Sequence, residues 1–162
     1  MIIGVPGSGK IEIVLRAMRI VKKMKKKMLL IAYNMQTIDN VIIRLTELQK
    51  DTPYTDRVNI VKVASITPSS NPKVAAFTNP CTTFESIDSM KAFITKSDVF
   101  VTLIHTSTST FLQTIPFTHT FFLEASLILE PLAINPILLS STFTMLGDYY
   151  QLNPTIKSYP AD

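Results

Sequence analysis

The apolar residues follow two periods along the chain, one typical of helices and one of buried strands. From residue 10 to about residue 26 they recur every three or four positions, which predicts an amphipathic helix. Residues 28–33 (MLLIAY) form an uninterrupted apolar run, the pattern of a strand buried on both faces of a parallel sheet. A second helical stripe covers residues 37–50, with Thr37 as its expected N-cap, and residues 58–64 predict another strand.

The second half of the chain predicts shorter elements. Residues 65–83 contain Pro68, Pro72 and Pro80, so we expect an irregular surface segment there. The pattern then predicts a helix over 84–96, strands over 98–103 and 121–123, a helix over 127–139 shortened or bent by its prolines, and a strand over 142–146. Strands that alternate with helices predict an α/β fold, with a parallel central sheet covered on both faces, in one domain spanning residues 1–162.

The composition is apolar for a domain of this length, with 46% hydrophobic residues and a mean hydropathy of +0.26. No apolar stretch approaches the roughly 18 residues of a membrane span, so we expect no membrane partner. A face that packs on another domain explains the excess better. A signal peptide is also disfavoured, since its apolar core would include Pro6, Gly7 and Lys10.

The net charge of +4 is compatible with a nucleic-acid partner. Much of it comes from one run, Lys22, Lys23, Lys25, Lys26 and Lys27. The ordinary interpretation is a solvated helix C-terminus; the alternative is a phosphate-contacting or nuclear-targeting patch. Cys81 is the only cysteine, which excludes an intrachain disulfide and fits a reducing compartment.

The most informative segment of the first half is GVPGSGKI, residues 4–11. It has the form GxxxxGK of a phosphate-binding loop, in which backbone N–H groups at a helix N-terminus surround a phosphate and Lys10 reaches the β- and γ-phosphates. The position after the lysine normally carries Ser or Thr, whose hydroxyl is a ligand of Mg²⁺. Here it is Ile11, which offers no oxygen.

Two further segments complete a pattern. Residues 123–126 read LEAS after the apolar pair Phe121 and Phe122, and residues 146–154 read LGDYYQLNP. The latter matches GDxxQLxP, with Asn153 where proline is common. In this order and separation the three segments resemble those of superfamily 1B helicases, and the resemblance is greatest to the helicase domain of the eukaryotic replication helicase/nucleases.

The resemblance extends between the motifs. Residues 29–45 (LLIAYNMQTIDNVIIRL) resemble the family segment LLTSYTHSAVDNILLKL, whose loop contacts the backbone of single-stranded DNA. The matching positions here are Tyr33, Asn34 and Gln36. Residues 60–65, 71–78 and 99–107 also resemble family segments, with His105 in place of a smaller residue; we interpret His105 as an ordinary loop histidine rather than a catalytic base.

The resemblance implies a P-loop NTPase fold of the RecA-like, three-layer type, with a truncated first strand, and a role for each motif. Glu124 would orient or activate the attacking water and Gln151 would contact the γ-phosphate, while Asp148 would order its loop. Leu123 stands where the family has the aspartate that holds Mg²⁺, so both expected metal positions, Ile11 and Leu123, are apolar. The implied nucleotide-binding residues are Gly4, Pro6, Gly7, Ser8, Gly9, Lys10, Ile11 and Asp148.

We therefore expect a partial helicase motor domain that binds ATP tightly but hydrolyses it poorly, because its Mg²⁺ site is degraded. Single-stranded DNA and a second helicase domain supplied in trans are the expected partners, and the resemblance implies a nuclear location. A second RecA-like domain, the nuclease domain and its iron–sulfur cluster are expected to be absent from residues 1–162. The alternatives are a non-catalytic module that binds protein or single strands, and a decayed fragment without independent activity.

Overall fold

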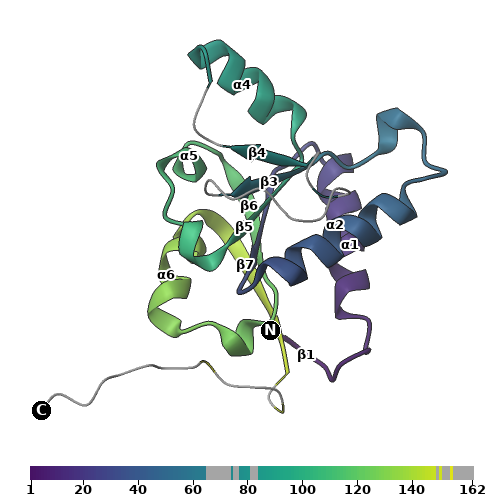
Figure 1. The fold of residues 1–162 in the computed structure, drawn as a ribbon, viewed down its shortest axis with the longest axis vertical. Coiled ribbons are helices and arrows are strands. Elements are labelled where there is room, and N and C mark those ends of the chain that lie inside the picture. The colour runs from purple at the N-terminus through teal and green to yellow at the C-terminus, as the bar shows by residue number, and fades with distance from the viewer. Residues whose placement is uncertain (65–73, 75–76, 81–83, 149, 151–153, 155–162) are drawn as a thin grey trace, which may run out of the picture.

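A seven-stranded parallel sheet forms the centre of the computed structural model, which describes residues 1–64, 74, 77–80, 84–148, 150 and 154. The strand order is β1-β7-β6-β2-β5-β3-β4 (Figure 1). The strands are β1 (Ile2–Ile3), β2 (Met28–Ala32), β3 (Ile60–Ala64), β4 (Thr78–Pro80), β5 (Val99–Leu103), β6 (Phe117–Phe122) and β7 (Ser140–Gly147). The helices are α1 (Lys10–Lys23), α2 (Met35–Leu48), α4 (Ile87–Lys96), α5 (Thr110–Gln113) and α6 (Glu130–Leu138), with 3₁₀ turns η1 (Tyr54–Asp56), η2 (Ile104–Thr106) and η3 (Ala125–Leu127).

The strand order explains why helices cover both faces. The chain moves across the sheet in one direction from β1 through β2 and β3 to β4, and in the other from β4 through β5 and β6 to β7. Because crossovers between parallel strands are right-handed, helices of the first set lie on one face and those of the second set on the other. Figure 1 shows α1 and α2 on one side of the sheet and α5 and α6 on the opposite side.

Strand β2 illustrates how the sequence produces these two interfaces. All five of its side chains are buried. Met28, Leu30 and Ala32 belong to the core that α1 and α2 complete, whereas Leu29 and Ile31 belong to the core beneath α5 and α6. An uninterrupted apolar run is the expected sequence for a strand with a hydrophobic layer on each side. The predicted three-layer α/β fold with a parallel sheet is confirmed.

Several element boundaries differ from the prediction because side-chain capping and tertiary pairing override periodicity. Helix α2 begins at Met35, and its N-cap is Asn34, not Thr37; the Asn34 Oδ1 accepts the Thr37 amide at 2.8 Å. Helix α4 begins three residues later than predicted, where Ser86 and Ser89 form a capping box. Strand β6 starts at Phe117, and β4 lies inside the segment expected to be irregular. Helix α5 was not predicted at all.

Strand β7 is tied to β6 by side chains as well as by its ladder. His119 on β6 lies between two threonine hydroxyls of β7, 2.6 Å from Thr142 Oγ1 and 2.8 Å from Thr144 Oγ1. The Thr142 hydroxyl donates to the Thr118 carbonyl, so it accepts from the imidazole Nδ1–H. Burial lowers the pKa of His119 below its ordinary value, which favours this neutral ring.

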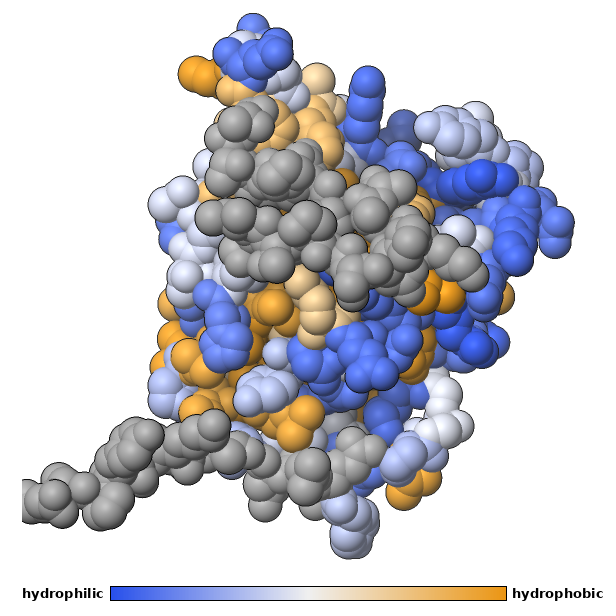
Figure 2. Space-filling model, in the orientation of Figure 1, coloured by the Kyte–Doolittle hydropathy of each residue, from blue (hydrophilic) through white to orange (hydrophobic). Residues whose placement is uncertain are grey.

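The apolar surplus of the sequence is visible on the outside of the molecule. Leu132, Ile134 and Leu138 of α6 are 37%, 55% and 77% exposed, and Figure 2 shows apolar side chains gathered over this part of the molecule. Within the described ranges, no helix has the length and apolar character needed to cross a membrane.

Candidate nucleotide site at the carboxyl edge of the sheet

Every motif that the sequence singled out, where the structure describes it, lies at one edge of the sheet. The strands are all parallel, so the segments after β1, β2, β5, β6 and β7 leave from their shared carboxyl ends. These segments carry the Gly4–Lys10 loop, Tyr33 and Asn34, His105, Glu124 and Asp148. Ligands of open parallel sheets bind outside this edge.

The loop from Gly4 to Lys10 has the backbone of a phosphate-binding turn. Gly7 and Gly9 have φ angles of 78° and 81°, in the left-handed region, and a Cβ built on either would meet no atom within 4 Å. The first intrahelical bond of α1 runs from the Glu12 amide to the Gly9 carbonyl at 2.9 Å. The amides of Lys10 and Ile11 precede it, so they are the donors that a helix N-terminus offers to an anion.

The Lys10 side chain folds back over this loop. Its ammonium donates to the Val5 carbonyl at 2.9 Å and to the Gly4 carbonyl. The charge therefore lies among the loop residues that would surround a phosphate. Phosphate oxygens would compete with these two carbonyls for the ammonium, which is the group that a GxxxxGK loop uses to neutralise phosphate charge.

Close backbone contacts bring the loop, β7 and the LEAS segment together. The Gly4 amide donates to the Gly147 carbonyl at 3.1 Å, which continues the β1–β7 ladder into the loop. A Cβ on Gly147 would lie 3.3 Å from the amide nitrogen of Ser126, tighter than ordinary contact distance. A glycine at the end of β7 thus lets η3, directly after Glu124, pack against the strand that leads to Asp148.

Glu124 is held by two polar side chains at the N-terminal end of α2, the N-cap Asn34 and Thr37. Its Oε2 accepts from the Asn34 Nδ2 at 2.9 Å and lies 2.9 Å from the Thr37 hydroxyl. The Thr37 hydroxyl also lies 3.0 Å from the Asn34 Oδ1, so its single proton serves one of these acceptors at a time. Glu124 has a φ of 51°, a left-handed conformation that costs about 1–2 kcal/mol for a residue with a Cβ. Strain of this kind is concentrated at functional sites.

The two expected metal positions are occupied by apolar side chains within the core. Leu123 is 4% exposed and belongs to the core formed with α1 and α2, and Ile11 packs against the same core. Neither can supply an oxygen to Mg²⁺, which takes oxygen ligands in near-octahedral geometry. Across the described residues, no group of three or more His, Cys, Asp or Glu side chains is arranged to hold a metal ion. These residues do not fit a protein-bound magnesium site.

The remaining predicted residues lie at the same edge with different roles. Asp148 is 3% exposed, and its Oδ1 accepts the Tyr150 amide at 3.0 Å, which closes the turn after β7. Pro6 and Ser8 lie in the glycine loop, where the Ser8 amide donates to the Val5 carbonyl at 3.2 Å. Gln151 and Asn153 lie outside the described residues.

The predicted nucleic-acid residues divide into two kinds. Gln36 and Tyr33 are exposed, whereas the side chain of Asn34 is committed to capping α2 and to holding Glu124. Tyr33 pairs with His105, their ring centroids 6.2 Å apart, so two exposed rings lie beside each other at the strand ends. Sequence reasoning missed this pairing and the contact of Thr37 with Glu124. The spacing of Asn34 and Thr37, a cap with a hydroxyl three residues later, was the available signal.

Comparisons with known proteins identify the fold class. One solved structure with this fold is an arterivirus nonstructural protein 10 helicase in complex with DNA. It matches with a TM-score of 0.59 and 18% identity, over 95% of this chain and 30% of that one. Another is the C-terminal part of the Fun30 ATPase domain, which matches with a TM-score of 0.55 and 11% identity, over 89% of this chain and 42% of that one. The chain has the P-loop NTPase fold of a RecA-like helicase domain.

Comparison of sequences indicates which helicases the chain resembles. The chain is 28% identical over 159 residues to the DNA replication ATP-dependent helicase/nuclease of Schizosaccharomyces pombe, and 24% identical over 165 residues to that of Xenopus laevis. These alignments cover 98% and 99% of this chain but 11% and 15% of the relatives, so the chain spans about a tenth to a seventh of their length. No family model matches the chain. The chain therefore resembles the replication helicase/nucleases over nearly all of its own length.

Proposed function

We propose that this chain is a helicase-derived nucleotide-binding domain that binds the phosphates of ATP in the Gly4–Lys10 loop and turns ATP over poorly on its own. The observation that carries the proposal is the loop itself, which combines two glycines with positive φ, the first amides of α1 and the Lys10 ammonium within residues 4–11. Glu124 and Asp148 follow neighbouring strands at the same edge.

The proposed weakness in hydrolysis follows from which groups are present. Glu124, held by Asn34 and Thr37, supplies a carboxylate that orients or activates a water. Ile11 and Leu123 supply no oxygen where the family places its two metal ligands. Magnesium brought in by ATP would be held by phosphate oxygens and water alone, and it would contribute less charge stabilisation at the γ-phosphate.

Lys10→Ala tests the phosphate loop. We expect the affinity for a fluorescent ATP analogue to fall by about 10- to 100-fold, because a charge-assisted contact to phosphate contributes roughly 1.5–3 kcal/mol. Binding by the unmodified chain should be nearly the same with Mg²⁺ as with EDTA. Lys91→Ala is the matched control, since it removes an exposed lysine of α4 far along the chain. Equal affinities for the Lys10→Ala and Lys91→Ala variants would refute the assignment.

For nucleic acid we propose that a single DNA strand crosses the carboxyl edge at Tyr33, with Gln36 beside it. The relatives are named as DNA replication proteins, and the arterivirus helicase is described in complex with DNA. The exposed rings of Tyr33 and His105 form a surface on which a base can stack. The Asn34 side chain has a different role: it donates a hydrogen bond to Glu124 and so connects this loop to the nucleotide site.

Tyr33→Ala is expected to weaken binding of a labelled single-stranded oligonucleotide by about 5- to 100-fold, because stacking contributes roughly 1–3 kcal/mol per base. Fluorescence anisotropy at fixed salt measures this change. Tyr54→Ala is the control, since Tyr54 is 84% exposed on η1 and lies on a different segment of the surface. If both variants bind the strand as tightly as the unmodified chain, the strand does not cross at Tyr33.

The proposal extends to partners by resemblance only. A helicase motor hydrolyses ATP between two RecA-like domains, so we propose that a second such domain in trans would complete the site, and that the chain acts in the nucleus. A non-catalytic module that binds nucleotide or a single strand is the second candidate. The apolar pair Ile11 and Leu123 favours it over an active motor.

A further inference from the structure

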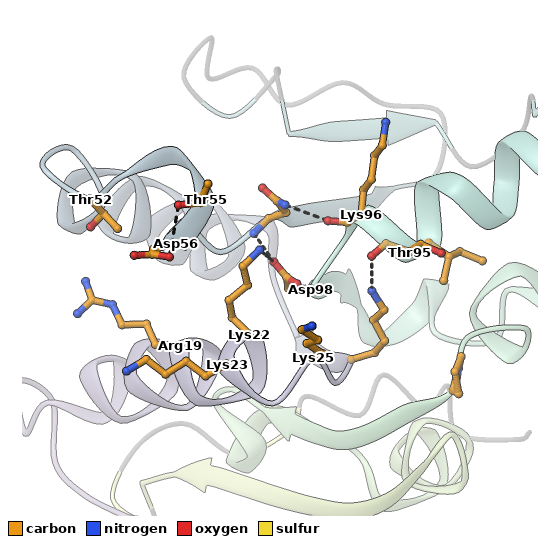
Figure 3. A pocket seen from close by; sticks show the side chains of 14 residues that line it. Arg19, Lys22, Lys23, Lys25, Thr52, Thr55, Asp56, Thr95, Lys96 and Asp98 are labelled. Carbon is orange, nitrogen blue, oxygen red and sulfur yellow. Dashed lines mark hydrogen bonds and ion pairs between the residues drawn. The ribbon is translucent and has the colours of Figure 1, made fainter.

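A large hollow lies at the amino edge of the sheet, opposite the nucleotide site. Its volume is about 1060 Å³. Figure 3 shows side chains from the end of α1, from the segment around η1 and from the end of α4 facing this hollow. Its lining residues include six cations, Arg19, Lys22, Lys23, Lys25, Lys27 and Lys96, and two carboxylates, Asp56 and Asp98.

Two of the six cations are used by the fold. Lys22 forms a 3.0 Å ion pair with Asp98, whose Oδ2 also accepts the Asn59 amide at 2.9 Å. Lys27 donates to the Thr95 carbonyl at 2.9 Å and to the Ser97 carbonyl. Burial lowers the pKa of Lys27, with Asp98 opposing the shift. Lys27 thus contacts carbonyls at the C-terminal end of α4, where a cation is favourable.

The other cations have no such role. The ammonium groups of Lys23, Lys25 and Lys96 make no hydrogen bond or ion pair with the residues that the structure describes, and Arg19 makes one long contact of 3.4 Å to the Leu48 carbonyl. Of the two carboxylates that line the hollow, Asp98 is paired with Lys22, and Asp56 forms no ion pair within the described part of the chain. The hollow therefore presents a clear excess of available positive charge.

Lys25 adds an independent observation. It follows the C-cap of α1 with a φ of 54°, while the Lys25 amide donates to the Lys22 carbonyl and the Lys26 amide to the Val21 carbonyl, each at 3.0 Å. This is the hydrogen-bond pattern of a Schellman motif, whose left-handed residue is usually glycine. A lysine there costs about 1 kcal/mol relative to glycine. The strained conformation places a charged side chain at the hollow.

From these contacts we propose that the amino-edge hollow is a binding site for a compact anion that carries several phosphate groups. Its available cations come from α1 and the turn that follows it, and Thr52 adds a neutral hydroxyl donor from the segment before η1. Its volume lies near the upper end of the roughly 300–1,000 Å³ of small-molecule sites.

The lining favours a compact polyphosphate over a nucleic-acid strand. Among the described residues, no Phe, Tyr, Trp or His side chain lines the hollow, so bases find no stacking partner there. Sites for single strands combine cations with such stacking platforms. Several cations close together along one wall of a hollow suit phosphate groups held close together on a small scaffold.

Inositol hexakisphosphate is a suitable probe, titrated calorimetrically into the purified chain at low and at physiological salt. We expect Lys25→Gly to weaken binding by about tenfold, while its melting temperature stays equal or rises because the left-handed strain is relieved. Lys23→Gln should weaken binding by about three- to tenfold. The opposite responses of affinity and stability in Lys25→Gly separate loss of a ligand contact from loss of fold.

Lys26→Gln is the matched control, because Lys26 is the exposed neighbour of Lys25 but does not line the hollow, and we expect unchanged affinity. Lys10→Ala should also leave probe binding unchanged, which separates this site from the glycine loop. Equal losses in Lys26→Gln and Lys25→Gly, loss in Lys10→Ala, or no binding at low salt would each overturn the proposal. A 12-nucleotide single strand is the competing ligand. If it binds more tightly than inositol hexakisphosphate and Lys25→Gly weakens both to the same extent, the hollow is a nucleic-acid contact and not a polyphosphate site.

Discussion

Leu123→Asp is expected to lower the free energy of unfolding by roughly 3–5 kcal/mol. Leu123 is 4% exposed and packs in the core that α1 and α2 share with the sheet. The substitution removes a buried leucine and places a carboxylate among apolar side chains, so the transfer and desolvation costs act in the same direction. Urea denaturation of the two proteins without nucleotide measures the difference.

The same substitution recreates half of the family's metal site. Combined with Ile11→Thr, it places a carboxylate and a hydroxyl at the two positions where the resemblance expects magnesium ligands. We expect Mg²⁺ with a non-hydrolysable ATP analogue to stabilise the double variant more than the unmodified chain, because the ion compensates the buried charge. The affinity for the analogue should also become dependent on Mg²⁺.

Leu123→Asn is the control for this experiment. Asparagine has the size of aspartate and removes the same leucine contacts, but it brings no negative charge to the metal. Ile11→Thr with Leu123→Asn should therefore be destabilised, with little recovery on adding Mg²⁺ and the analogue. Equal recovery of the Asp and Asn double variants, or none in either, would show that residues 11 and 123 are not the metal positions.

The sequence predicted the fold because the features that determine it are local. The run of residues 28–33 and the stripe of α1 are explained by burial on one or two faces, and a residue's neighbours in sequence carry that information. Strand β6 was predicted too short because Thr118, His119 and Thr120 interrupt its apolar pattern. In the structure these polar groups are satisfied by hydrogen bonds, for example from the Thr118 hydroxyl to the Lys27 carbonyl at 3.0 Å.

The candidate site was predictable as a set of motifs but not as a set of contacts. The glycine loop and Glu124 follow from sequence patterns, and their shared edge follows from parallel topology. The bond from Asn34 to Glu124 joins residues 90 positions apart, so no local pattern contains it. The lysine run shows the same limit. Its sequence predicted a solvated helix end, which the exposed Lys23 and Lys25 at the end of α1 confirm, but no local pattern contains the hollow that α4 and the η1 segment complete beside them.

Asp39→Ala is expected to destabilise the chain by about 3 kcal/mol, in the range for breaking a buried ion pair. Lys62 on β3 has a side chain that is 1% exposed, and its ammonium lies 2.9 Å from the Asp39 Oδ1 on α2. Asp39 is 18% exposed, so the expected cost lies at the lower end of that range. Removing the carboxylate leaves a buried ammonium without this partner, and the desolvation cost of the charge is no longer offset.

Lys62→Met should cost less than Asp39→Ala, because methionine fills a similar volume and the carboxylate left behind retains contact with water. A double-mutant cycle in urea should give a coupling energy of about 1–3 kcal/mol. The pair also anchors α2, whose N-cap is Asn34 and whose first turn carries Thr37. Asp39→Ala should therefore loosen the hold on Glu124 and weaken nucleotide-dependent stabilisation. Additive single effects, or a larger cost for Lys62→Met, would show that the ion pair does not anchor the helix.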